Sequence, residues 1–193
     1  MFPRRTIVFD ISSVVPRNSA FDVHSRNIKK MFIKENINKD IDPKYFVDYY
    51  EDVYGSIGVA LENEFDISIE RYLHYMNGKE RYDLLKMNEN IVKFVKNNNC
   101  ILFTNSPRYR AFKILTSIGI HNVPMICMED LLYHNESVYP NINNMKPSIK
   151  AFEIAEKYIK LNVSDFVYFD DNRKNIYAAK TRNWRVAEVP IKL

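Results

Sequence analysis

Three short apolar segments, far apart in the sequence, each end in polar side chains, and this feature limits the fold more than any other. The segments are residues 6–9, 100–103 and 166–169. Their aliphatic, β-branched and aromatic composition is typical of strands buried on both faces of a parallel sheet. The polar residues that follow them are Asp10, then Thr104 and Asn105, then Asp170 and Asp171. Because ligands bind outside the carboxyl ends of such strands, these side chains are expected to converge on one site.

Helical patterns alternate with strands from about residue 82 onward. Helices are predicted at 90–96, 108–117, 147–159 and 175–180, and short strands at 124–127 and 184–186. Pro147 suits the first turn of its helix, where the N–H that proline lacks has no partner. Residues 128–145 are polar and predict a surface loop. The alternation predicts an α/β fold: a Rossmann-like parallel sheet with helices on both faces.

Residues 18–79 differ in pattern from the rest of the chain and predict an inserted group of four short helices. Asp42 before Pro43, and Ser68 further on, mark two helix starts. The tyrosines of this stretch are expected to be core residues more often than ligand contacts. The sequence therefore predicts two domains, an α/β core of residues 1–17 and 80–193 and a small helical insert of residues 18–79.

The surplus positive charge lies entirely in the last quarter of the chain. Residues 1–139 hold 18 Lys and Arg against 18 Asp and Glu, whereas residues 140–193 hold 10 against 6. A basic end on a neutral body is compatible with an anionic partner, including RNA or a ribonucleoprotein such as the ribosome. A solvated helix face is the alternative interpretation. The candidate polyanion contacts are Arg108, Arg110, Arg173 and Lys174.

The cysteines and the apolar runs indicate in which cellular compartment the protein is expected. Cys100 and Cys127 both lie in apolar stretches and are expected to be buried thiols, and the four histidines are scattered singly, so neither a disulfide framework nor a zinc site is predicted. No signal peptide and no apolar run long enough to span a membrane is found. The expected location is the reducing cytoplasm, with no membrane partner.

The residues at the strand ends have the chemistry of a metal-assisted phosphoryl site. Carboxylates from two strands suit Mg²⁺, which prefers oxygen ligands. The hydroxyl of Thr104 and the ammonium of Lys146 would suit a phosphoryl group beside that metal, and Asp10 could attack phosphorus. The structural alternative is that a cluster of carboxylates and lysine only holds the strand ends together.

Four segments carry a family resemblance, and they occur in the family's order: residues 8–10, 102–105, 146–153 and 168–176. They resemble the motifs of the haloacid dehalogenase (HAD) superfamily, specifically its pyrimidine 5′-nucleotidase-like branch. The resemblance implies that Asp10 is the nucleophile and Asp171 a metal ligand. It implies that Thr104, Asn105 and Lys146 bind phosphate.

The same resemblance implies that the helical insert is a cap, since Tyr50 with Tyr54-Gly55 is similar to a cap motif of that branch. One departure stands out. HAD phosphatases carry a second Asp two residues after the nucleophile and commonly a Thr two residues later, where this chain has Ser12 and Val14. HAD dehalogenases also lack the second Asp, but their surrounding set of residues is not found here.

The missing Asp protonates the leaving oxygen and then activates water, and a serine hydroxyl titrates far too high to replace it. Losing positioned acid–base catalysis costs about 10²–10⁴-fold in rate. The main-chain carbonyl of Ser12 can still be a metal ligand together with Asp10 and Asp171, so Mg²⁺ binding can survive without turnover.

Two functions remain open from the sequence. The first is a HAD-fold pseudoenzyme that binds a nucleotide, or RNA or a ribonucleoprotein such as the ribosome, with or without Mg²⁺. The second is a Mg²⁺-dependent phosphohydrolase of nucleoside 5′-monophosphates with Asp10 as its nucleophile. Retention of Asp10, Thr104, Lys146 and Asp171 favours the second, and Ser12 favours the first.

Overall fold

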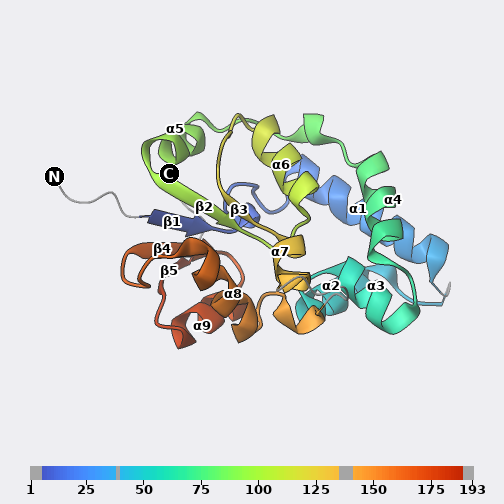
Figure 1. Cartoon of the computed structure of the whole chain (residues 1–193). Coiled ribbons are helices and arrows are strands. Elements are labelled where there is room, and N and C mark those ends of the chain that lie inside the picture. Colours follow the sequence, from blue (N-terminus) through green and yellow to red (C-terminus); the bar gives the residue numbers. More distant parts are fainter. Residues whose placement is uncertain (1–5, 38–39, 135–140, 189–193) are drawn as a thin grey trace. The chain divides into compact units, whose positions relative to one another are not determined.

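The computed structural model describes residues 6–37, 40–134 and 141–188 (Figure 1). The chain divides into two compact units, one of Met1–Pro16 with Lys86–Leu193 and one of Arg17–Leu85. The domain boundaries drawn from the sequence stay a prediction, and each unit is described by itself. None of the helices in the described ranges is long and apolar enough to cross a membrane.

A five-stranded parallel sheet forms the centre of the first unit. Its strands are β1 (Thr6–Phe9), β2 (Asn99–Phe103), β3 (Met125–Ile126), β4 (Phe166–Asp170) and β5 (Arg185–Glu188). They lie in the order β3-β2-β1-β4-β5, so β1 is central, and Phe9 is in register with Leu102 on one side and Phe169 on the other. All four residues of β1 are buried. The prediction of a Rossmann-like α/β sheet is confirmed.

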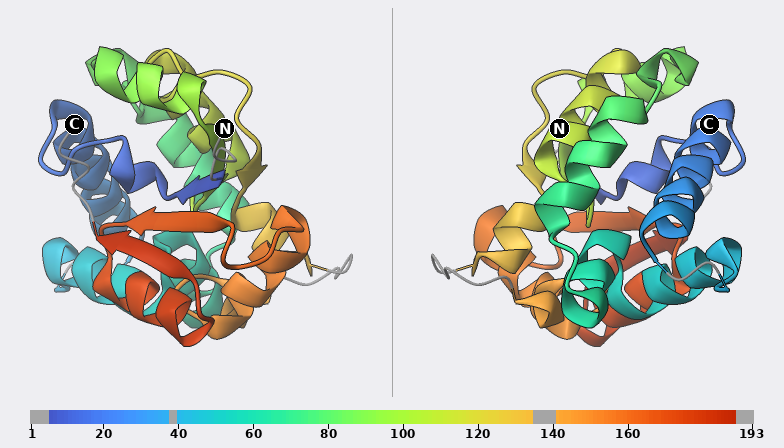
Figure 2. Two further views of the ribbon diagram at one scale, coloured as in Figure 1. Left: turned by 90° about the vertical axis from the view of Figure 1, so that its left-hand side faces the viewer. Right: turned by 90° about the vertical axis from the view of Figure 1, so that its right-hand side faces the viewer.

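Helices cover both faces of this sheet. They are α5 (Glu89–Asn97), α6 (Arg108–Ser117), α7 (Met128–Leu132), α8 (Ile149–Ile159) and α9 (Arg173–Thr181), with short 3-10 turns η1 (Ile11–Ser13) and η4 (Ile142–Asn144). Figures 1 and 2 show α5 and α6 on one side of the sheet and α8 and α9 on the other. Phe103, Phe152, Phe166, Tyr168 and Trp184 pack ring to ring under the sheet, with neighbouring centroids 4.8–6.1 Å apart. This aromatic core fixes the carboxyl ends of β2 and β4.

The prediction of a surface loop at residues 128–145 is wrong for the part that the structure describes. Met128–Leu132 forms α7, and Leu131 is fully buried. Asp130 caps this helix by accepting a hydrogen bond from the backbone N–H of Cys127, the residue before the helix, at 2.7 Å. The apolar residues of the segment share one helical face, a pattern that the polar residues around them obscured. Residues 135–140 of the predicted loop lie outside the described residues.

The prediction that Pro147 lies in the first turn of its helix is also wrong. Helix α8 begins at Ile149, and Ser148 is its N-cap, with the Ser148 hydroxyl accepting a hydrogen bond from the backbone N–H of Lys150 at 3.2 Å. A serine oxygen satisfies an otherwise unpaired N–H of the first turn, so the helix starts after the serine rather than at the proline.

The second unit is helical. It consists of α1 (Ala20–Asn36), α2 (Pro43–Tyr54), α3 (Ile57–Phe65), α4 (Ile69–Lys79) and the 3-10 turn η2 (Tyr82–Leu84). Asp42 and Ser68 cap α2 and α4 as predicted. The aromatic and aliphatic core includes Phe32, Phe46 and Tyr72. Tyr45 and Tyr49 instead lie on the surface, 66% and 47% exposed, so the expectation of core tyrosines holds for only part of the set.

Candidate active site

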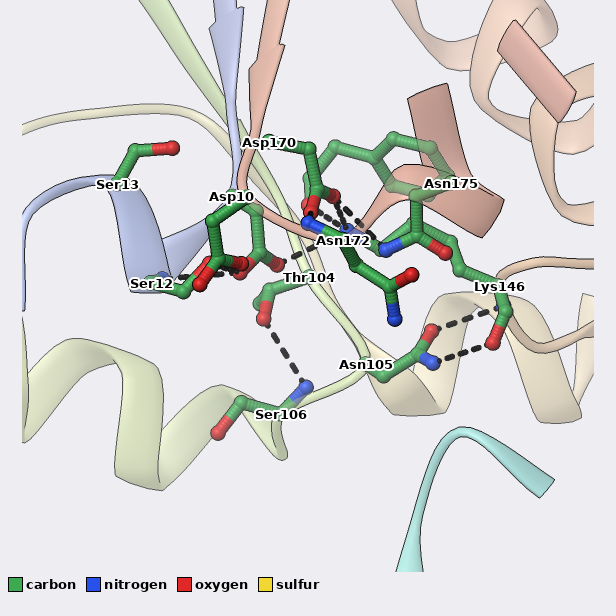
Figure 3. Close-up of polar contacts among 12 residues, drawn as sticks. Asp10, Ser12, Ser13, Thr104, Asn105, Ser106, Lys146, Asp170, Asn172 and Asn175 are labelled. Atoms are coloured by element: carbon green, nitrogen blue, oxygen red, sulfur yellow. Dashed lines mark hydrogen bonds and ion pairs between the residues drawn. The ribbon is translucent and has the colours of Figure 1, made fainter. Parts of the chain in front are cut away.

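The polar residues after the three central strands meet at one edge of the sheet (Figure 3). Asp10 follows β1, Thr104 and Asn105 follow β2, and Asp170 ends β4. Because β1 pairs in parallel with both β2 and β4, the chain leaves all three strands on the same side. Residues more than a hundred positions apart in the sequence are therefore neighbours in this site.

Ser12 lies between two carboxylates. Its backbone N–H and its hydroxyl both donate to Oδ2 of Asp10, at 2.9 and 2.5 Å, and the hydroxyl lies 2.8 Å from Oδ1 of Asp171. A hydroxyl has one proton, so it can donate to only one of the two carboxylates at a time. When both carboxylates are ionised, the one that receives no proton faces a lone pair of the Ser12 hydroxyl oxygen, and the two repel each other. A cation at this point would remove the repulsion.

Lys146 neutralises part of this charge from inside the protein. The residue is 2% exposed, and its Nζ lies 2.9 Å from Oδ1 of Asp10 and 3.1 Å from Oδ2 of Asp170. It also donates to the carbonyl of Phe103 at 2.8 Å and to the Tyr168 hydroxyl at 3.0 Å. An ammonium has three protons, so these four acceptors saturate it.

Asn105 holds the backbone of Lys146. Its Nδ2 donates to the Lys146 carbonyl at 2.8 Å, and its Oδ1 accepts from the Lys146 N–H at 3.0 Å. This paired contact orients the lysine toward the carboxylates. Asn105 was predicted to bind phosphate, and in the structure both polar atoms of its side-chain amide pair with the backbone of Lys146.

Thr104 is buried beside this pair, at 2% exposure. Its hydroxyl oxygen accepts a hydrogen bond from the N–H of Ser106 at 3.2 Å. No described residue accepts the proton of that hydroxyl, which leaves Thr104 able to donate to a ligand.

Asp170 is tied to the protein on both oxygens. Its Oδ1 accepts from the N–H of Asn172 at 2.8 Å, and its Oδ2 accepts from Lys146, from the Tyr168 hydroxyl and from Nδ2 of Asn175 at 2.9 Å. Sequence reasoning assigned no role to Tyr168 or Asn175. Tyr168 could have been found, since residues two apart on a strand share a face and Asp170 follows it by two.

Burial and the close charges shift the pKa values of the site. Burial raises the pKa of Asp10, but the charge of Lys146 and the hydrogen bonds from Ser12 lower it more, so it lies below its usual value. Burial and the charge of Asp10 raise the pKa of Asp170. Burial lowers the pKa of Lys146, yet its two carboxylates raise it above its usual value. Asp10 and Lys146 are therefore an ionised pair at neutral pH.

Three carboxylates fit a hard divalent cation. Oxygens of Asp10, Asp170 and Asp171 lie within 4.8 Å of one another, and this is the one cluster of three or more acidic, histidine or cysteine side chains in the described ranges. The ammonium of Lys146 pairs directly with two of them, Asp10 and Asp170. A buried excess of negative charge is costly unless a cation balances it. The donors are all oxygens, which suits Mg²⁺.

The four predicted polyanion contacts are not all available. The guanidinium of Arg108 pairs with Asp130 and donates to the Met125 carbonyl at 3.3 Å. Arg110 donates to the Ser106 hydroxyl at 3.2 Å. Arg173 and Lys174 form the exposed first turn of α9, directly after the carboxylates.

No protein-family model and no curated protein matches this sequence. Solved structures do match its fold. A hydrolase from Pseudomonas syringae superimposes with a TM-score of 0.63 at 14% identity, covering 98% of this chain and 96% of that one. A haloacid dehalogenase-like hydrolase from Bacteroides fragilis gives a TM-score of 0.62 at 10% identity, covering 96% and 87%. The chain has the HAD-like fold.

The same fold occurs in an L-2-haloacid dehalogenase from Xanthobacter autotrophicus, whose structure holds covalently bound chloropropionic acid. It matches with a TM-score of 0.51 at 10% identity and covers 97% of this chain and 78% of that one. In the HAD-like fold of this chain, Asp10, Ser12, Lys146 and Asp171 are brought into one connected set of contacts, with Thr104 and Asn105 beside them. Their roles as nucleophile, metal ligands and phosphate-binding residues stay predictions.

Proposed function

We propose that this chain is a Mg²⁺-dependent binder of a nucleoside monophosphate, in which phosphate hydrolysis is slow. The observation that supports it is the position of the Ser12 hydroxyl, hydrogen-bonded between Asp10 and Asp171. At this point a HAD phosphatase is expected to hold its general acid and base. The site keeps the charged groups that would bind a metal and a phosphate, and it lacks the acid and base that would promote hydrolysis.

Binding rests on the carboxylates, on the hydroxyl of Thr104 and on the positive charge of Lys146. Asp10 and Asp171, with the Ser12 carbonyl, would hold the metal, and a bound Mg²⁺ would supply positive charge for phosphoryl oxygens. Thr104 has a hydroxyl proton to donate, and Lys146 offsets the charge of the nucleophile. Asn105 contributes indirectly, because its side chain holds the backbone of Lys146 in place.

Slow turnover follows from what surrounds Asp10. The other acidic group buried beside it, Asp170, accepts four hydrogen bonds and lies against Lys146, so it is not free to carry protons to a leaving group. Without positioned acid–base catalysis, the rate is expected to be about 10²–10⁴-fold below that of a phosphatase that has it.

A nucleotide is favoured over RNA or the ribosome as the ligand. The resemblance of Tyr50 and Tyr54-Gly55 to a nucleotidase cap motif supports a nucleotide. The RNA prediction depended in part on Arg108, whose guanidinium is engaged by Asp130 and a backbone carbonyl. Arg173 and Lys174 are exposed, but two cations are too small a set to carry an RNA proposal alone.

The second candidate is a working nucleoside monophosphate phosphohydrolase. The lowered pKa of Asp10 favours it, because an ionised carboxylate is the form that attacks phosphorus. Metal binding needs the same ionised carboxylate, so the lowered pKa of Asp10 distinguishes the two candidate functions less well than Ser12 does.

Calorimetric titration with uridine monophosphate tests the proposal. Binding is expected with Mg²⁺ and not with excess EDTA, and Asp171→Asn is expected to weaken it about tenfold or more. Asp165→Asn, the same change at an exposed loop position, is the matched control and is expected to bind like the unaltered chain. Rapid phosphate release that Asp10→Asn abolishes would overturn the proposal and establish the phosphohydrolase. Absence of Mg²⁺-dependent binding would overturn both.

A further inference from the structure

The helical unit contains an open cavity with a mostly apolar exposed lining, and three lysines are among its lining residues, none of which belongs to the carboxylate site. One helical face of α1 forms one wall through Asn27, Lys30, Met31 and Lys34, and the start of α2 forms the other through Asp42, Pro43 and Lys44. The cavity has a volume of about 330 Å³. This is at the lower end of the range for small-molecule sites.

Three lysines at this cavity have no acidic partner among the described residues. The neighbouring cations of α1 are different: Arg26 pairs with Asp48, and Lys29 with Glu51. Lys30, Lys34 and Lys44 make no such pair in the described part of the chain, so their charge is available to an anion. Unlike the paired residues, all three line the cavity, so three lysines without acidic partners surround it.

One acidic side chain lines the cavity, and it is partly occupied. Asp42 caps α2 by accepting a hydrogen bond from the backbone N–H of Lys44 at 2.9 Å. The lining therefore carries three positive charges against one negative charge. An anion is favoured over a cation or a neutral ligand.

The floor of the cavity is apolar. Met31 is a large apolar residue that is 47% exposed, and it lines the cavity together with Pro43. Cations around an apolar floor fit a ligand with a charged end and an apolar body. Methionine adapts its shape to such bodies more readily than branched residues do.

We infer that this cavity binds a phosphorylated small molecule, with its phosphate held by Lys30, Lys34 and Lys44 and its apolar body lying on Met31 and Pro43. The site is independent of the function proposed for the carboxylate cluster. Lysine binds phosphate as a point charge, and three lysines from two helices can contact one phosphate group.

The test uses phenyl phosphate, which has both parts of the inferred ligand, with inorganic phosphate as the probe that lacks the apolar part. The full chain is labelled with ¹³C at its methionine methyl groups, and excess EDTA removes the contribution of the carboxylate site. The Met31 signal is identified as the one absent from the Met31→Ala variant. It is expected to shift on titration with phenyl phosphate, and less at equal concentrations of inorganic phosphate.

The charge is tested by Lys30→Gln, Lys34→Gln and Lys44→Gln combined. Each exposed charge pair is worth about a two- to fivefold change in affinity, so the combined variant is expected to bind about tenfold to a hundredfold more weakly. The matched control makes the same substitution at three exposed lysines of the other unit: Lys86, Lys93 and Lys180. The control is expected to bind like the unaltered chain.

Three results would overturn the inference. The Met31 methyl signal does not move up to tens of millimolar phenyl phosphate; or the lysine variant and its control lose affinity equally; or the signal responds to vesicles of anionic phospholipid and not to phenyl phosphate. The last result would assign the lysines to a membrane surface. None of them bears on Mg²⁺-dependent nucleotide binding, which is measured at Asp171.

Discussion

Ser12→Asp restores the carboxyl group that HAD phosphatases carry at this position and is expected to create phosphatase activity. Ser12 lies on η1, with its side chain directed at Asp10 and Asp171. An aspartate there is two residues from the nucleophile and can reach the oxygen of a leaving group. If the missing acid and base is the main defect, kcat with Mg²⁺ rises by about 10²–10⁴-fold.

Two opposing free-energy effects are expected in the Ser12→Asp variant. A gain of 10²–10⁴-fold corresponds to about 3–5 kcal/mol of transition-state stabilisation. Against it, a new carboxylate replaces a hydroxyl that contacts Asp10 at 2.5 Å and Asp171 at 2.8 Å. Like charges about 4 Å apart repel by about 4 kcal/mol at an effective dielectric constant of about 20. The variant is therefore expected to be less stable than the unaltered chain in EDTA, and Mg²⁺ is expected to recover most of the difference.

The assay measures phosphate release from uridine monophosphate and from an aryl phosphate at saturating Mg²⁺, and urea denaturation measures stability in Mg²⁺ and in EDTA. Ser13→Asp is the control, because the Ser13 hydroxyl donates to the Phe169 carbonyl at 3.2 Å rather than to a carboxylate. A folded, Mg²⁺-binding Ser12→Asp variant with no more activity than Ser13→Asp would refute the reasoning. It would mean that the site lacks more than its proton carrier.

Two further changes test the buried charges. Lys146→Met leaves Asp10 and Asp170 without their ammonium partner. The free energy of unfolding, measured by urea denaturation, is therefore expected to fall by about 3–5 kcal/mol. A loss below about 1 kcal/mol would contradict a buried ion pair. Glu156→Gln removes a carboxylate that accepts hydrogen bonds from the Arg182 guanidinium and the Trp184 indole. The free energy of unfolding at pH 7 is expected to fall by about 1.5–3 kcal/mol. Burial raises the pKa of Glu156, but these partners lower it below its usual value. The carboxylate therefore stabilises the fold above pH about 4.5 and loses this effect as pH falls through its folded pKa. The difference between Glu156→Gln and the unaltered chain is expected to shrink at pH 3, and a constant difference would contradict it.

Much of the fold was accessible from local pattern. The apolar runs at 6–9, 100–103 and 166–169 predicted buried parallel strands, because only a sheet covered on both faces gives a strand no polar side. The caps at Asp42 and Ser68 were predicted for the same kind of reason, since an N-cap depends on a few adjacent residues. The pattern failed at α7, where a five-residue helix offers too few turns for periodicity to stand out from the polar residues around it.

The sequence by itself determined which side chains end the strands, and it determined that residue 12 is an alcohol and not an acid. Only the tertiary structure decided their partners: that Lys146 saturates its protons on Asp10, Asp170, Tyr168 and a carbonyl, and that one hydroxyl is shared between two carboxylates. Apart from the contact between Ser12 and Asp10, those contacts join residues 22 to 159 positions apart. They follow from the order of the strands around β1, which packing across the whole sheet sets and no short stretch of sequence encodes.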